Sequence, residues 1–176
     1  MTDDRTFPAA LTAVSRVAFD YDHGRGIDYE PYGAFLSAEE TTEWFRAWTG
    51  NDEVDGDAFR MFGQQGAGGL VALWLVRKGR PLAEQPVVYL GSEGETVHLA
   101  RDLADFLWLL AQGVGPTDVA HGDGVGDEDR RARPDAAMTT VAERFAAGRR
   151  REPQAILRDA AEGIPDLEDT VLALCG

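Results

Sequence analysis

Apolar residues recur at helical spacing in several parts of the chain, most clearly after Ser37. Ser37 and Glu40 form a capping box, in which the serine hydroxyl accepts from an early backbone N–H and the glutamate reaches back to the cap. Behind it, apolar positions follow the i, i+3, i+4, i+7 rule at Thr41, Trp44, Phe45 and Trp48. Gly50 is predicted to end the helix. The pattern predicts a helix that buries an aromatic face, and structure alone explains its tryptophans.

Five further segments carry a helical pattern or composition. They span residues 7–21, 100–112, 136–150, 153–163 and 167–174. In the second of these the apolar side chains exceed one stripe, so we expect this helix to pack on two sides.

Three short runs of residues have the character of strands. They span residues 70–76, 86–90 and 95–99, and tight turns separate them. Such runs favour an antiparallel or mixed sheet, so the predicted fold class is α+β with helices flanking the sheet. The glycine-rich stretch 63–69 is interpreted as a bent entry into the first strand.

Chain length favours one domain over residues 1–176. From 115 to 135 the composition shifts to Gly, Asp and Arg between Pro116 and Pro134, which predicts a linker. Residues 136–175 then form a predicted helical C-terminal extension.

Charge is the most informative feature of the composition. Acids outnumber bases 31 to 17, for a formal net charge of −14. Residues 1–57 hold 13 of these acids and four bases. Such a field repels phosphate backbones, which disfavours direct nucleic-acid binding, and it steers a basic partner onto the acidic surface. The alternative is that the charge serves solubility alone.

Compartment is predicted from cysteine usage and apolar runs. Cys175 is the single cysteine, so the chain forms no internal disulfide, which fits a reducing compartment. The acidic start lacks the layout of a signal peptide, and the longest apolar run, Leu70–Val76, is too short to cross a membrane. We expect a cytoplasmic protein without a membrane partner.

Residues 51–57 are rich in possible calcium ligands, but their spacing does not match that of a calcium-binding loop. With Gly56 as the sharp-turn glycine of a twelve-residue calcium loop, position twelve is Phe62, where a bidentate glutamate is needed. The glycine-rich stretch 63–69 precedes a strand and is followed by no Lys-Ser or Lys-Thr, unlike a phosphate loop. We therefore predict neither a metal site nor a cofactor.

Nucleophilic and acid–base motifs are also missing from the pattern. Ser92 lacks the first glycine of a nucleophile elbow, because Leu90 stands there. His23, His98 and His121 are scattered, and His98 is expected on the opposite sheet face from its neighbours. With 31 acids, coincidental carboxylate pairs are inevitable. The prediction is no catalytic residue and no enzyme.

The order of motifs resembles a known superfamily. A glycine-rich stretch enters a strand within residues 59–74, a Pro-Val-led strand follows at 86–91, and the helix at 103–110 carries Asp-Phe-Leu. This pattern resembles the SUKH superfamily, which unites the yeast Smi–Knr cell-wall-synthesis regulators with many bacterial proteins. The block at 29–51 looks like a bacterial branch of it. The resemblance covers about residues 28–113, and its motifs are structural.

The resemblance implies an immunity protein that neutralises a cognate bacterial toxin, often a nuclease, by direct binding. The negative charge agrees, since a toxin that acts on nucleic acid usually presents a basic groove. The first contacts to test are Asp52, Glu53, Asp55 and Asp57, for which a solvated loop is the alternative. Two other hypotheses are a regulatory or scaffold protein of this fold with a non-toxin partner, and an enzyme with an unrecognised site.

Overall fold

The computed structural model describes residues 4–21, 26–122 and 133–176. Five antiparallel strands form one sheet, in the spatial order of their sequence, β1-β2-β3-β4-β5. The strands are β1 (Glu30–Pro31), β2 (Phe59–Gln64), β3 (Leu70–Trp74), β4 (Val87–Leu90) and β5 (Thr96–Ala100). The predicted α+β class with an antiparallel sheet is confirmed.

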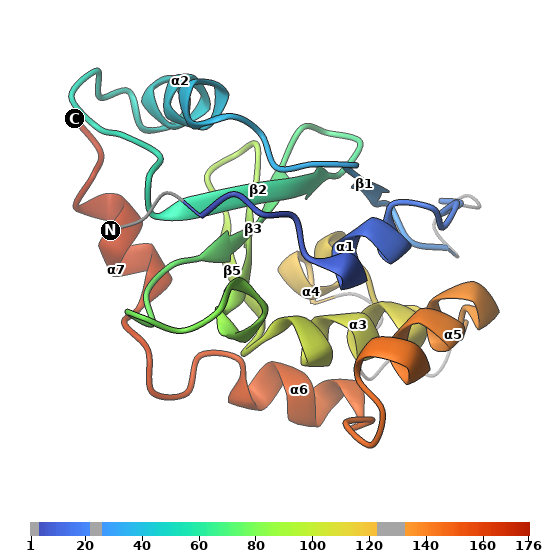
Figure 1. Ribbon diagram of the computed structural model, residues 1–176. Coiled ribbons are helices and arrows are strands. Elements are labelled where there is room, and N and C mark those ends of the chain that lie inside the picture. The colour runs from blue at the N-terminus through green and yellow to red at the C-terminus, as the bar shows by residue number, and fades with distance from the viewer. Residues whose placement is uncertain (1–3, 22–25, 123–132) are drawn as a thin grey trace.

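Helices cover both faces of this sheet (Figure 1). They are α1 (Ala9–Val14), α2 (Ala38–Thr49), α3 (Leu103–Ala111), α4 (Pro116–Ala120), α5 (Ala136–Phe145), α6 (Pro153–Asp159) and α7 (Leu167–Leu172), with a 3₁₀ turn at Leu82–Glu84. One core packs α1, α3, α5 and α6 against the sheet, and a second core packs α2 and α7 against the opposite face. The result is three layers with the sheet in the middle.

Two covered faces explain the apolar strands. Successive strand residues point to opposite faces, so a strand buried on both sides needs apolar residues at every position. In β3, Val71 and Leu73 enter the first core, whereas Leu70, Ala72 and Trp74 enter the second. All five residues are buried. The continuous run Leu70–Trp74 is therefore a central strand.

Local sequence rules account for α2. Ser37 Oγ accepts from the Glu40 N–H at 3.1 Å, and Glu40 Oε2 accepts from the Ser37 N–H at 2.8 Å, which completes the predicted capping box. Gly50 ends the helix in the left-handed conformation, at φ 67°. Thr41 and Phe45 are buried, while Trp44 and Trp48 are half-buried.

The structure also departs from the predictions. Strands β1 and β2 were not predicted, and β1 begins at Glu30. Helix α4 lies in the predicted linker, where Asp118 accepts from the Gly115 N–H; residues 123–132 of that linker lie outside the described residues. Helices α1, α5, α6 and α7 are all shorter than predicted.

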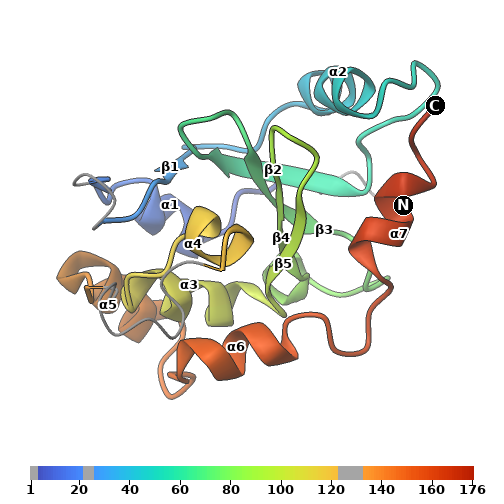
Figure 2. The same cartoon turned by 180° about the vertical axis from the view of Figure 1, so that it is seen from behind.

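The C-terminal helices contribute to both cores. Helices α5 and α6 place Met138, Ala142 and Ile156 in the first core, and α7 places Leu167 and Val171 in the second. Figure 2 shows α7 beside the sheet, with the C-terminus near the end of α2. Among the described helices none is long and apolar enough to cross a membrane.

Candidate binding surface

The loop between α2 and β2 is tied down by its backbone. Three inward hydrogen bonds run from Arg46 Nε to the Val54 carbonyl (3.0 Å), from the Gly56 N–H to Thr42 Oγ1 (3.1 Å) and from Arg60 Nη1 to the Asp57 carbonyl (2.8 Å). Gly56 is packed so closely on α2 that a Cβ there would lie 2.5 Å from Thr41 Cγ2. Val54 is buried beneath the loop. The loop therefore has a defined shape.

The carboxylates of this loop point the other way. Asp52, Glu53, Asp55 and Asp57, the four residues selected from the sequence, are all exposed. Asp55 Oδ1 accepts from the Asp57 N–H at 3.0 Å. No lysine or arginine in the described part of the chain forms an ion pair with any of the four. Among the described residues these four carboxylates form no ion pair, and the guanidinium groups of Arg46 and Arg60 bond instead to the backbone of the loop.

The structure adds a second acidic segment that sequence reasoning missed. Asn51 Nδ2 donates to the Leu174 carbonyl at 2.9 Å, and the Gly176 N–H donates to the Thr49 carbonyl at 3.4 Å. These bonds hold the end of the chain against the loop (Figure 1). Residues 50–57 and 166–176 together contain seven acids and no lysine or arginine. A base-free C-terminal stretch was visible in the sequence, but its place beside the loop was not.

Helix α7 presents acidic residues in its first turn. Asp166 caps the helix by accepting from the Asp169 N–H at 2.9 Å, and Glu168 and Asp169 are exposed. Negative charge at a helix N-terminus is stabilised by the helix dipole. We define the acidic face as the exposed carboxylates of the loop and of this turn, namely Asp52, Glu53, Asp55, Asp57, Glu168 and Asp169.

A small pocket opens beside the acidic face. It has a volume of about 180 Å³ and is lined by Trp48, Gly94, Thr96, Glu168, Val171, Leu172 and Cys175. Leu172 is 61% exposed, and among the large hydrophobic residues that the structure describes only Tyr21 is comparably exposed. The indole Nε1–H of Trp48 donates to the Gly91 carbonyl at 2.7 Å, which fixes the ring.

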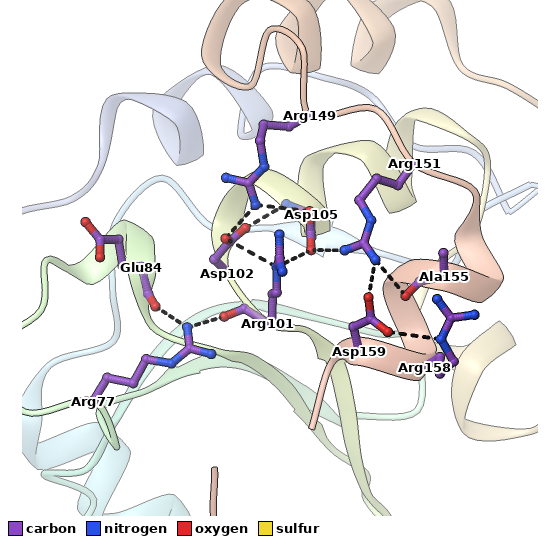
Figure 3. A network of polar contacts seen from close by, with 10 residues as sticks. All are labelled: Arg77, Glu84, Arg101, Asp102, Asp105, Arg149, Arg151, Ala155, Arg158 and Asp159. Atoms are coloured by element: carbon purple, nitrogen blue, oxygen red, sulfur yellow. Dashed lines mark hydrogen bonds and ion pairs between the residues drawn. The ribbon is translucent and has the colours of Figure 1, made fainter. Parts of the chain in front are cut away.

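A network of ion pairs lies on the opposite side of the sheet (Figure 3). Asp105 of α3 is fully buried and sits between three arginines. Its carboxylate lies 2.9 Å from Arg101 Nε, 3.3 Å from Arg149 Nη2 and 3.2 Å from Arg151 Nη1. The network ties α3 to the connection between α5 and α6.

Hydrogen bonds within this network shift Arg149 and Arg151 further toward the charged form. The bond from Arg149 to Asp102, at 2.8 Å, raises the pKa of Arg149 above its usual value. The bond between Arg151 and Asp159 raises the pKa of Arg151 and lowers that of Asp159. Arg149 and Arg151 are therefore structural, because each pairs with carboxylates of the fold. Arg150, which stands between them in the sequence, lies over the Trp108 ring.

The stretch 63–69 forms the β2–β3 hairpin, in which Gly63 and Gly69 pack against the rings of Tyr29 and Tyr89. The described residues contain no group of three or more His, Cys, Asp or Glu side chains placed to hold a metal ion.

His98 lies on the face of β5 that carries the second core, opposite Val88 and near the Trp74 ring. This confirms the expected alternation with its neighbours. Both ring nitrogens are buried without a hydrogen-bond partner among the described residues. Burial lowers the pKa of His98, although nearby Asp166 acts in the opposite direction. The His98 ring contributes to packing beside Trp74.

Comparison of the chain with protein-family models, with curated proteins and with solved structures finds no match.

Proposed function

We propose that this chain is a protein-binding module whose acidic face binds a basic protein, most specifically an immunity protein that neutralises a bacterial toxin by occluding it. One observation supports this above all. The chain end that follows the acidic helix α7 is bonded to the acidic loop, from Asn51 to Leu174, and no described lysine or arginine forms an ion pair with the exposed carboxylates of either segment. The resemblance of residues 28–113 to the SUKH superfamily points the same way.

The contrast with the rest of the charged surface strengthens the proposal. Asp105 and Asp159, which tie helices α3 and α6 to the rest of the fold, each lie within 3.3 Å of arginine side chains. Close packing of like charges is unfavourable without counter-charges, so a face of six carboxylates works against folding. A bound basic partner supplies the missing positive charge.

The fixed shape of the loop between α2 and β2 lowers the entropic cost of binding a partner. Association costs the entropy of ordering interface segments, and a preorganised loop has already met that cost during folding. The three inward hydrogen bonds and the packing of Gly56 on α2 provide this rigidity. A complementary field also raises the association rate, to about 10⁸–10⁹ M⁻¹s⁻¹ at low salt against about 10⁵–10⁶ M⁻¹s⁻¹ for neutral surfaces.

The test begins with the full chain immobilised and exposed to an extract of its own source cells at low salt. Proteins that elute as salt is raised are identified, and the gene of each is then expressed in a bacterial host with and without this chain. We expect a basic domain whose expression alone stops growth and whose toxicity disappears on co-expression.

A matched pair of variants makes this test specific. Asp52→Asn, Glu53→Gln and Asp57→Asn together remove three charges from the acidic face, while Glu143→Gln, Glu152→Gln and Glu162→Gln remove three from exposed positions elsewhere. The first variant should lose protection and the second should keep it. A partner that is basic but harmless would favour the regulatory or scaffold hypothesis. A partner that binds both variants equally would overturn the proposed face.

A further inference from the structure

The pocket beside the acidic face is too small for a cofactor-sized molecule. Pockets for such ligands measure about 300–1,000 Å³, and this one measures about 180 Å³. It opens on the same surface as Glu168 and Leu172, so a protein docked on the acidic face would cover it. The fitting occupant is one side chain of that partner.

The chemistry of the residues around the pocket indicates which kind of side chain fits it. The walls are apolar or aromatic at Trp48, Val171 and Leu172, and the charged group at the rim is the carboxylate of Glu168. Arginine combines an aliphatic stem with a planar cation that stacks on aromatic rings and binds a carboxylate with two parallel hydrogen bonds. An acidic side chain would be repelled, and a purely apolar one would leave the rim charge unpaired.

The pocket is also preformed. Trp48 is held by its bond to the Gly91 carbonyl and by stacking on Trp44, with ring centroids 5.1 Å apart. Val171 is buried in the second core, which fixes α7 behind the pocket. No rearrangement is needed before a side chain enters, which reduces the entropic cost of binding.

We infer that the pocket formed by Trp48, Glu168, Leu172 and the β4–β5 hairpin receives an arginine side chain of the partner protein. This inference rests on the proposed function and deepens it. It assigns the acidic loop to long-range attraction and the pocket to the anchoring contact, because a few buried anchors usually dominate the affinity of an interface.

The test uses short peptides on the full-length, ¹⁵N-labelled protein at constant ionic strength. Acetyl-Gly-Arg-Gly-amide is compared with acetyl-Gly-citrulline-Gly-amide, in which a neutral urea replaces the guanidinium at nearly the same shape. We expect the arginine peptide to shift the Trp48 indole N–H and the backbone signals of Gly94, Val171 and Leu172, with saturation. The citrulline peptide should produce smaller shifts at equal concentration.

Variants then separate the pocket from the general charge. Glu168→Gln should weaken arginine-peptide binding by roughly threefold, as expected for one exposed charge pair, whereas Glu162→Gln removes an equal charge away from the pocket and should leave it unchanged. Equal shifts from both peptides, or shifts confined to residues 52–57, would overturn the inference. In the latter case the acidic face would still stand as a binding surface, and the co-expression experiment tests that face independently.

Discussion

Asp105 allows the clearest prediction about stability. Replacing it by asparagine preserves its shape and removes the single carboxylate that three arginines share. Removing one member of a buried ion pair typically costs about 3–5 kcal/mol, because the remaining charge loses its counterpart. Here the arginine side chains are 37%, 40% and 25% exposed, so water can partly solvate them, and each keeps a second carboxylate, Asp102 or Asp159. We therefore expect the lower end of that range, about 3 kcal/mol.

Equilibrium urea unfolding, monitored by tryptophan fluorescence, measures this loss directly. About 3 kcal/mol corresponds to a fall in Tm of roughly 6–12 °C for a chain of this size. The control is Asp135→Asn, at a helix N-cap where Asp135 Oδ1 accepts from the Met138 N–H. Asparagine caps a helix about as well as aspartate, so this variant should change stability by less than about 0.5 kcal/mol.

Salt provides a second check on the same reasoning. Buried pairs are screened far less than exposed ones, so the loss at Asp105 should persist in about 0.5 M NaCl. A loss of about 1 kcal/mol or less would refute the claim that this network holds the C-terminal helices to α3.

Three further predictions concern the loop, the buried histidine and the pocket. Gly56→Ala places a Cβ 2.5 Å from Thr41 Cγ2 and should destabilise the fold by about 1–3 kcal/mol in urea unfolding, whereas Gly33→Ala, with open space around it, should be close to neutral; equal effects would contradict the close packing. Because burial lowers the pKa of His98 below 6.5, its neutral form is favoured by folding: this contribution to stability is intact above pH 6.5 and is lost as pH falls from 6.5 toward the folded pKa. His98→Phe should flatten the pH dependence of the unfolding free energy between about pH 7.5 and about pH 5.5, and an unchanged slope would contradict this assignment. Carbamidomethylation of Cys175 should block the pocket and abolish the shifts caused by the arginine peptide, and unchanged shifts would argue against pocket entry.

The sequence predicted the elements whose determinants are local. The capping box at Ser37 and the left-handed Gly50 define both ends of α2 without help from the rest of the fold. The three strands within residues 70–100 have apolar runs separated by tight turns, and all three are present. Local rules were sufficient in both cases.

The missed elements depend on tertiary contacts. In β2, the buried Arg60 interrupts the apolar pattern, and the register shifts between Met61 and Gly63. The Arg60 guanidinium donates to the backbone carbonyls of Asp4 and Asp57, and the apolar pattern of the sequence does not identify these partners. Strand β1 has only two residues and exists because it pairs with β2.

The candidate site also has a part that was predicted from the sequence and a part that was not. Its loop was chosen from a run of acids near one end of a predicted helix, and those four carboxylates are exposed. Glu168 and Leu172 were not chosen, because their place beside the loop depends on the long-range bond between Asn51 and Leu174. Charge along a sequence indicates how acidic a surface is, but tertiary structure decides which acids share it.

The central claim is that the acidic face steers and binds a basic protein. The most direct measurement is the association rate constant of the captured partner, over a range of salt concentrations, with wild type and the two three-charge variants. Each variant changes the formal net charge equally, from −14 to −11. At low salt we predict a rate at least about fivefold lower for Asp52→Asn/Glu53→Gln/Asp57→Asn, with a shallower salt dependence, and a rate near wild type for Glu143→Gln/Glu152→Gln/Glu162→Gln. Identical rates and salt dependences for the two variants would contradict the account.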